Sequence, residues 1–534
     1  MDAAIRLSKR VALPWAIEIA LVVTLALALR TLNLLSLPAF FDESGYIRWA
    51  VDIWDQKTRA ALFIPMTQDG KQPLFMWLAA PIIPLFSDPL LGARVVSAIA
   101  GVASALGVYF AGYWLAGRSV GLMAGLLYAA VPFNLFFDRM ALVEGLLNAG
   151  GVWGLTMSAF LARRAECRRE AAIGGVALGL ALSVALWTKM TAVFALPIPV
   201  LCALFLTRRG KARVSLFGFS VGAAVLGSLT LLLSLLPGAE NLVDKAGSFS
   251  KNPWELVGLP WDDWARNLLD YWSFIQGYFV APLWWLLLAS AGWALLIRRR
   301  VALLLLLCWA AATLPPTLLA VPKLYASRYV AHGVFPLLIL IADFSVWGWG
   351  RVGGRWRSIG GEWRSFLVAA ALLLAILAPT LSFDYRLLEA PEHAGLPPSD
   401  QRLYVTGWTA GYGFNDALRV VRQRAAELTK GGQPILLLSG DLRGTPYAAL
   451  KVYLKDMPDI HHHVDMHLAH DPEGFMMAWK WHRVPILLVG NHGYDDLPAF
   501  ERGVPQAKLL GSFPKPGGQS YFRVYEVAKE DLDP

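Results

Sequence analysis

The sequence has little charge and almost no cysteine. Charged residues make up 16% of the chain, whereas an average soluble protein carries about 25%. The three cysteines are too few for a disulfide framework, and two of them, Cys202 and Cys308, lie inside apolar runs. The sequence contains no P-loop, no dinucleotide-binding fingerprint after a strand and no nucleophile elbow. Its motifs therefore give no support to an ATP-driven or nucleotide-sugar mechanism.

Long apolar runs are what the chain has in abundance. Of its 534 residues 56% are hydrophobic, and the mean hydropathy is +0.48. Runs long enough to cross a bilayer lie near 12–34, 91–116, 119–136, 141–162, 171–188, 190–206, 214–236, 279–297, 301–321, 328–349 and 365–382. They predict an α-helical multi-pass membrane protein with about eleven spans, the first a retained anchor and not a signal peptide. Segment 73–86 is only about 14 residues long, so we expect it to be interfacial or re-entrant.

Basic residues indicate how the chain is oriented in the membrane. The net charge of +9 is spread over short clusters and forms no single face, which argues against a nucleic-acid partner. If 73–86 does not cross and the N-terminus is cytoplasmic, the clusters at 163–169, 208–213, 298–300 and 351–364 all fall on the cytoplasmic side. Loop 35–90, the turns at 138–144 and 187–189, loops 237–278 and 322–328, and everything after about 383 then face outward. We expect a prokaryotic cell membrane as the location.

The chain divides into two parts by composition. Residues 1–383 form the predicted transmembrane domain, with the outer loop 35–90 carrying the candidate site, and residues 384–534 form a predicted extracytoplasmic soluble α/β domain. In the second part we expect strands at 403–406, 434–438, 485–489 and 521–525, and helices at 414–429 and 445–455, after a Pro-rich linker at 391–398. The Trp-rich stretch 254–285 fits an aromatic belt at the membrane surface, although such rings can also line a sugar or lipid groove.

Two adjacent acids, Asp42 and Glu43, follow the first span directly. A carboxylate at the membrane surface can deprotonate an incoming hydroxyl or hold a cation against a phosphate. In the same outer loop, Lys71 offers a compact positive charge to a lipid phosphate at headgroup depth. The structural alternative is a snorkelling lysine beside a solvated acidic loop.

Further candidates lie in the other outward turns. Glu144 stands deeper than Asp138, for which helix capping is a sufficient explanation. Arg328 and Tyr329, shortly after Lys323, begin a span and suit a phosphate, although interfacial anchoring accounts for them equally well. Lys189, alone between two spans, is a weaker indication.

A His-rich stretch, 461–470, raises the question of a metal. If His463 and His467 shared a helix face, they could bind one, but a polar surface segment is the more ordinary interpretation. Which cofactor, if any, the protein uses is left open, and a divalent cation is one possibility.

Together these landmarks resemble the GT-C membrane glycosyltransferases of the protein O-mannosyltransferase and lipid A aminoarabinose transferase superfamily. The resemblance covers about residues 10–350 and rests on the order of the landmarks Asp42-Glu43, 71–77, 93–98, 117–118, 139–144 and Arg328-Tyr329. It implies a GT-C fold, a polyprenyl-phosphate-linked monosaccharide donor and inversion at the sugar carbon. Some members resemble metal-assisted enzymes and others work without metal.

Roles follow from the resemblance residue by residue. Asp42 matches the acid at the catalytic centre, and Lys71 matches the lysine at the donor phosphate, where the usual motif is Lys-Pro-Pro and Gln72 replaces the first proline. Glu144 takes the place of a usual aspartate. We therefore expect Asp42 as the general base with Glu43 and Glu144 supporting it, and Lys71, Arg328 and Tyr329 at the donor phosphate.

The function expected from the sequence is an inverting transfer of a monosaccharide from a polyprenyl phosphate to an extracytoplasmic protein, lipid or glycan. One alternative is a lipid or sugar transporter or flippase, for which ionisable residues near mid-membrane and repeated halves would be expected. Another is a membrane-anchored binding protein whose outer domain does the work.

Overall fold

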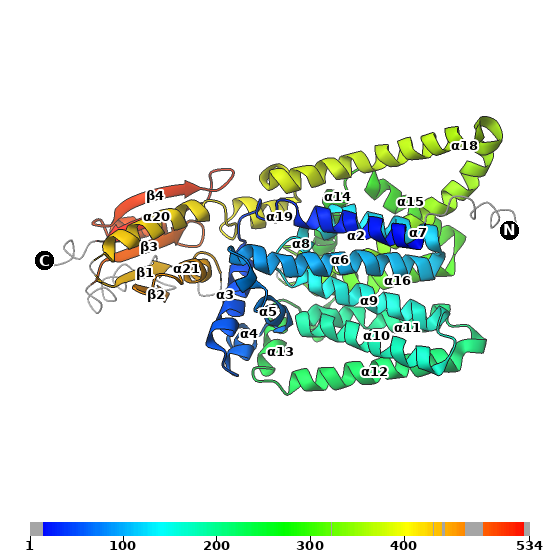
Figure 1. The fold of residues 1–534 in the computed structure, drawn as a ribbon, viewed down its shortest axis with the longest axis horizontal. Helices are drawn as coiled ribbons and strands as arrows, with labels where there is room; N and C mark the ends of the chain where they lie inside the picture. Colours follow the sequence, from blue (N-terminus) through cyan, green and yellow to red (C-terminus); the bar gives the residue numbers. More distant parts are fainter. Residues whose placement is uncertain (1–13, 322, 431, 440–443, 465–483, 528–534) are drawn as a thin grey trace.

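Helices dominate the molecule and lie side by side in one bundle, with a small sheet at one end (Figure 1). The computed structural model describes residues 14–321, 323–430, 432–439, 444–464 and 484–527, and for 253, 352–374, 463 and 464 it describes the backbone alone. The division into two domains stays a prediction, and its expected boundary at 383/384 falls inside a helix that runs from Phe335 to Glu389.

Most bundle helices coincide with the apolar runs. The bundle helices are α2 (Trp15–Thr31), α6 (Pro89–Ala116), α7 (Arg118–Ala130), α8 (Pro132–Asp138), α9 (Glu144–Arg163), α10 (Arg168–Thr188), α11 (Pro197–Leu206), α12 (Ala212–Ser234), α14 (Trp261–Tyr278), α15 (Leu283–Ile297), α16 (Arg300–Leu319) and α18 (Phe335–Glu389). Of these, α14 lies in the stretch 237–278 that was expected to be an outer loop. Local signals set their ends. At α6, Asp88 caps the helix by accepting a hydrogen bond from the Leu90 N–H (2.8 Å), Pro89 follows at the first helical position, and Gly117 ends the helix.

Several of these helices are long and apolar enough to cross a membrane. Among the described residues five qualify alone, and up to seven if each bent pair, α7 with α8 (58°) and α14 with α15 (120°), counts as one span. The two expected spans 328–349 and 365–382 largely fall within α18. The protein is an integral multi-pass membrane protein, and the count of about eleven spans stays a prediction.

Short helices fill the space between the bundle and the sheet (Figure 1). The loop expected to carry the site folds into α3 (Phe41–Gln56), η1 (Ala61–Phe63), α4 (Ile64–Asp69), α5 (Leu74–Ala79) and η2 (Ile83–Leu85). Segment 73–86 thus forms only short helices, too short to cross. The remaining short elements are η3 (Met190–Ala195), η4 (Arg209–Lys211), α13 (Glu240–Gly247), η5 (Pro253–Gly258) and α17 (Arg328–Ala331).

The sheet of the C-terminal part has the strand order β2-β1-β3-β5-β4. Strands β1 (Ile435–Ser439), β2 (Ile460–Val464) and β3 (Ile486–Asn491) are parallel, and β5 (Tyr521–Val527) runs antiparallel to β3 and to β4 (Lys508–Pro514). Alternate residues point to opposite faces. One face packs on α20 (Phe414–Leu428) and α21 (Tyr447–Tyr453), and the other packs on α23 (Leu497–Gly503).

Two expectations for this part are wrong. Segment 403–406 is not a strand but belongs to a π-helical turn, η7 (Arg402–Thr406), which follows η6 (Pro391–His393) and α19 (Pro398–Gln401). Its Tyr404 packs on Phe40 and Phe136, with ring centroids 4.7 and 5.1 Å apart, so this apolar segment is buried against the bundle instead of the sheet. His463 lies on strand β2, so no helix face unites it with His467; residues 465–470 lie outside the described residues.

The two parts of the chain meet at α3. Helix α21 packs on α3, the hydroxyls of Ser44 and Thr445 lie 2.6 Å apart, and the Tyr453 hydroxyl donates to Asp88 (2.8 Å). Gly411, which leads into α20, approaches the chain just before α3 so closely that a Cβ atom there would lie 2.1 Å from the Ala39 carbonyl oxygen. Only glycine fits this contact.

Gly411→Ala should lower the midpoint of thermal unfolding, since relieving a clash with backbone costs about 1–3 kcal/mol. The change is measured on the purified full chain in detergent. Gly210→Ala is the control, because an added Cβ there meets no atom within 4 Å. Equal unfolding midpoints for the two variants would contradict the tight contact.

Candidate active site

Glu43 is the buried anchor of the loop that carries the site. Its side chain is fully buried, and both of its oxygens accept hydrogen bonds from Arg94, from Nε to Oε1 (2.8 Å) and from Nη2 to Oε2 (2.7 Å). The backbone N–H groups of Phe40 and Ala141 donate to the same carboxylate at 2.9 and 2.6 Å. Glu43 therefore has no oxygen left for a substrate.

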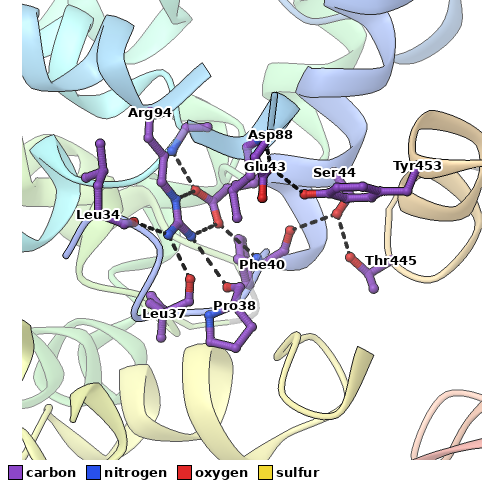
Figure 2. Close-up of polar contacts among 12 residues, drawn as sticks. Leu34, Leu37, Pro38, Phe40, Glu43, Ser44, Asp88, Arg94, Thr445 and Tyr453 are labelled. Atoms are coloured by element: carbon purple, nitrogen blue, oxygen red, sulfur yellow. Dashed lines mark hydrogen bonds and ion pairs between the residues drawn. The ribbon is translucent and has the colours of Figure 1, made fainter. Parts of the chain in front are cut away.

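Arg94 extends this anchor to the preceding loop. Its Nη1 donates to the carbonyl oxygens of Leu34 and Leu37, each at 2.7 Å, so the guanidinium is surrounded by oxygens (Figure 2). A bidentate Arg–carboxylate pair is geometrically specific as well as strong. The pair fixes the end of the first predicted span, the start of α3 and the turn before α9 relative to one another.

Asp42 faces the other way. Consecutive residues on a helix point about 100° apart, so the anchoring of Glu43 turns Asp42 out of the protein core. Arg328 donates from Nη1 to Asp42 Oδ2 (2.6 Å), and the Lys71 ammonium lies 3.9 Å from Oδ1. Burial opposes the charge of Asp42, but Lys71 and then Arg328 outweigh it and hold the pKa of this carboxyl well below its usual value. Asp42 is thus an anion between two cations.

Lys71 reaches this position because the chain turns sharply at Gly70. Gly70 has a φ of +57°, and a Cβ there would lie 2.3 Å from the Asn241 carbonyl oxygen, so glycine is required on both counts. The Lys71 ammonium lies 3.2 Å from Asp69 and 4.7 Å from the centre of the Tyr46 ring. Asp69 also binds Lys245 of α13 (2.6 Å), which draws a second lysine to the same place.

Glu144, at the first position of α9, forms an ion pair with Lys189 (2.7 Å) through Oε1. Its other oxygen, Oε2, is buried and has no hydrogen-bond partner among the described residues. Buried carboxylate oxygens normally have partners, so Oε2 is a candidate acceptor for a group bound in the cavity that Glu144 lines. Lys189 also lies over the ring of Tyr329 (4.8 Å), which places it beside Arg328.

Contacts of the preceding residue, Ser327, help to fix the position of Arg328. Asp400 of α19 accepts hydrogen bonds from the Ser327 N–H (3.2 Å) and from the Tyr278 hydroxyl (2.6 Å), which fixes the residue just before Arg328. The guanidinium then lies over the rings of Phe40 and Tyr329, at 5.4 and 5.3 Å. Aromatic faces favour a cation at such distances.

Asp42 and the charged side chains around it line one cavity of about 530 Å³. Asp42, Lys71, Glu144, Arg328 and Tyr329, all named from the sequence, line it together, whereas Glu43 does not. Lys189, Lys245 and Lys323 line it as well, so cations outnumber the acids Asp42, Asp69 and Glu144. A cavity of this charge suits an anion.

A second cavity, of about 510 Å³, meets the first at Asp42 and Arg328. It lies toward the C-terminal part and is lined also by Asp270, Arg402 and Thr409. The residues that line both cavities are Phe41, Asp42, Lys323, Tyr325, Arg328 and Trp408. Asp42 therefore lies where a molecule in either cavity can reach it.

The donor set does not fit a divalent cation. No three His, Cys, Asp or Glu side chains gather closely enough to hold a metal among the described residues. The oxygens of Asp42 face Arg328 and Lys71, which supply the positive charge that a metal would bring to a phosphate.

Sequence reasoning underrated Lys189 and missed Lys245 and Trp408. Lys189 had no neighbouring charge in the sequence to mark it, and its partner Glu144 is 45 residues away. Lys245 lies on α13, whose sequence shows only a short amphipathic pattern. Trp408 follows the segment that was expected to be a strand, so its place beside Asp42 could not be seen.

The fold is that of the GT-C membrane glycosyltransferases. ArnT from Cupriavidus metallidurans bound to undecaprenyl phosphate is similar over 98% of this chain and 100% of its own, with a TM-score of 0.57 and 16% identity. The archaeal oligosaccharyltransferase AglB from Archaeoglobus fulgidus, in complex with an inhibitory peptide and a dolichol-phosphate, is similar over 95% of this chain and 73% of its own (TM-score 0.53, 14% identity). The oligosaccharyltransferase of the same organism in complex with Zn and sulfate is similar with a TM-score of 0.53, at 15% identity and over 97% and 74% of the two chains.

A family model described as dolichyl-phosphate-mannose-protein mannosyltransferase matches residues 70–234. No curated protein matches the sequence. The family model and the shared fold confirm the resemblance to the GT-C membrane glycosyltransferases of the protein O-mannosyltransferase and lipid A aminoarabinose transferase superfamily.

Glu43→Gln should destabilise the protein strongly, because Arg94 is then left buried without a counter-charge, at a cost of about 3–5 kcal/mol. The midpoint of thermal unfolding in detergent measures the change. The double variant Glu43→Leu, Arg94→Met removes both charges and should unfold at a higher temperature than Glu43→Gln. If Glu43→Gln unfolds like the wild type and only transfer is lost, Glu43 takes part in the chemistry instead.

Proposed function

We propose that this protein transfers a monosaccharide from a polyprenyl-phosphate donor to an extracytoplasmic acceptor, with inversion at the sugar carbon. The observation that carries the proposal is the position of Asp42 between Lys71 and Arg328, at the junction of two cavities. Similar folds that hold undecaprenyl phosphate and dolichol-phosphate support the choice of donor. The proposed orientation puts the N-terminus in the cytoplasm and this end of the bundle, with the C-terminal part, outside.

Lys71 and Arg328 are the proposed ligands of the donor phosphate, with Tyr329 beside them. The phosphate is the leaving group, and fixed cations stabilise the negative charge that it gains as the bond to the sugar breaks. Lys189 and Lys245 add positive charge in the same cavity. A donor anchored in the bilayer explains why these cations gather at one end of a membrane bundle and not in a soluble nucleotide pocket.

Asp42 is the proposed general base. It accepts the proton of the acceptor hydroxyl while the acceptor oxygen attacks the sugar carbon from the side opposite the phosphate, which inverts that carbon. Donor in one cavity and acceptor in the other give this in-line arrangement. Glu144 contributes its unpaired Oε2 as an acceptor for a hydroxyl of the bound sugar, and Glu43 acts only by positioning α3.

Binding of the donor makes Asp42 a stronger base. In the free protein Lys71 and Arg328 hold the pKa of Asp42 low, and a carboxylate with so low a pKa is a weak base. A phosphate bound by the same two cations takes part of their charge from Asp42, so the pKa of Asp42 rises. Proton removal from the acceptor is therefore favoured only once the donor is in place.

A transporter or flippase receives no support from the family match or the shared fold. A membrane-anchored binding protein would need no arrangement of Asp42 between two cations. Incubating membranes with radiolabelled polyprenyl-phosphate sugars separates these alternatives, since only a transferase moves label into an acceptor fraction.

Asp42→Asn should lower transfer about 10²- to 10⁴-fold, the usual contribution of a general base, with little effect on thermal unfolding. Label transfer by the purified variant measures the loss. Asp52→Asn is the matched control, because Asp52 lies on the same helix and pairs with Arg48 (3.4 Å), away from both cavities. Near-wild-type transfer by Asp42→Asn would refute the assignment of the base.

The pH dependence of transfer should differ between free enzyme and donor complex. Because the base works only when deprotonated, the rate falls as the pH drops through its pKa. We expect the acid limb of kcat, which reports the complex, at higher pH than the acid limb of kcat/KM, which reports the free enzyme. Lys71→Gln, which removes one cation, should shift the limb of kcat/KM to higher pH. Coincident limbs in the wild type would show that the donor does not change the pKa of the base.

A further inference from the structure

Trp408 stands at the junction of the two cavities. It lies on the loop between η7 and α20, and it lines both cavities beside Asp42 and Arg328. Its ring packs against Phe41, with centroids 5.2 Å apart and planes at 77°, and against Tyr494 of the C-terminal part, with centroids 5.1 Å apart. Its exposure is intermediate, so part of the indole is free to contact a molecule in the cavities.

Side chains of the C-terminal part fix the backbone of Trp408 by hydrogen bonds. Its carbonyl oxygen accepts hydrogen bonds from Lys515 Nζ and from Asn491 Nδ2, each at 2.9 Å. Lys515 also donates to the Gly407 carbonyl (3.2 Å) and to Asn491 Oδ1 (2.9 Å). On the other side, the Phe41 N–H donates to the Thr409 carbonyl (3.0 Å), which joins this loop to the residue before Asp42.

Burying the ammonium of Lys515 here is unfavourable for the free energy of folding. Lys515 is only 2% exposed, and among the described residues the partners of its ammonium are carbonyl oxygens and the Phe522 ring at 4.3 Å, with no carboxylate. Burial lowers its pKa to about 7. A buried lysine that bonds two consecutive carbonyls of one loop fixes the path of that loop, and the side chain so fixed is Trp408.

We propose that the indole of Trp408 is the wall on which the transferred sugar stacks. The inference rests on the proposed function. With the phosphate at Lys71 and Arg328 in one cavity and the acceptor in the other, the sugar is the part of the substrates that must lie where the cavities meet. Sugars present a face of C–H groups that packs on an aromatic ring, and the indole N–H can also donate to a sugar hydroxyl.

Lys515 and Asn491 are positioning residues in this arrangement. They touch neither cavity and act through the carbonyl of Trp408. The C-terminal part thereby completes the sugar site of the membrane part.

The test compares two ligands that differ only in the sugar. Affinities of the purified full chain are measured for undecaprenyl phosphate and for undecaprenyl phosphates carrying mannose, glucose, galactose or arabinose. For the sugar that wild type binds best, Trp408→Ala should weaken binding about tenfold and leave binding of undecaprenyl phosphate within twofold of wild type. Trp408→Phe should lie between, and Lys515→Met should repeat the pattern of Trp408→Ala more weakly.

Trp254→Ala is the matched control, because Trp254 is 81% exposed on η5 and lines neither cavity. It should bind both ligands like wild type. Equal weakening of both ligands by Trp408→Ala, or no weakening of either, would overturn the sugar contact. If wild type itself transferred no sugar and bound no sugar conjugate more tightly than undecaprenyl phosphate, the proposed function would fail, a result distinguishable from a failure of Trp408 alone.

Discussion

The buried pair between Glu43 and Arg94 determines where everything else at the site lies. It satisfies both oxygens of one acid and joins three separate backbone segments, at Phe40, at Ala141 and at Leu34 and Leu37. An ion pair removed from water is stable only when its remaining hydrogen-bonding groups are satisfied, and here they are. Its consequence is geometric: the neighbouring Asp42 can point only toward the cavity.

Around Asp42 the charges are arranged as a chain of ion pairs. Lys245 and Lys71 share Asp69, Lys71 and Arg328 share Asp42, and Lys189 binds Glu144. Every one of these cations has a protein partner, which balances part of the positive charge of the cavity. The members of these pairs come from several elements: Asp42 lies on α3, Asp69 on α4, Glu144 on α9 and Arg328 on α17, whereas Lys71 and Lys189 lie just outside helices.

Most of the bundle helices and five residues of the candidate site could be predicted from the sequence. Long apolar runs located the helices of the bundle, and the order of landmarks brought Asp42, Lys71, Glu144, Arg328 and Tyr329 into one site. The resemblance singled out Asp42 as the base, but the sequence could not show that Glu43 is a buried anchor, since that depends on Arg94, which is 51 residues from Glu43.

The expectations that failed all concerned segments whose structure is set by contacts with residues far away in the sequence. Residues 403–406 were predicted to be a strand because a short apolar run fits a buried strand and a buried helical segment equally well. In the structure they belong to a π-helical turn, in which Tyr404 packs against Phe40 and Phe136. His463 was considered for a helix, but pairing of β2 with β1 made it part of a strand. Trp408 had no local pattern at all, because its importance arises from Lys515 and Asn491 in distant strands and turns.

The contact between the Phe41 N–H and the Thr409 carbonyl joins residues that are made far apart in time. Synthesis proceeds at about 5–20 residues per second, so α3 emerges roughly tens of seconds before Lys515 is available to hold the 407–409 loop. Until then the membrane helices are inserted but the wall beside Asp42 is missing. A chain whose synthesis has not yet reached Lys515 therefore lacks the hydrogen bonds that hold the carbonyls of Gly407 and Trp408.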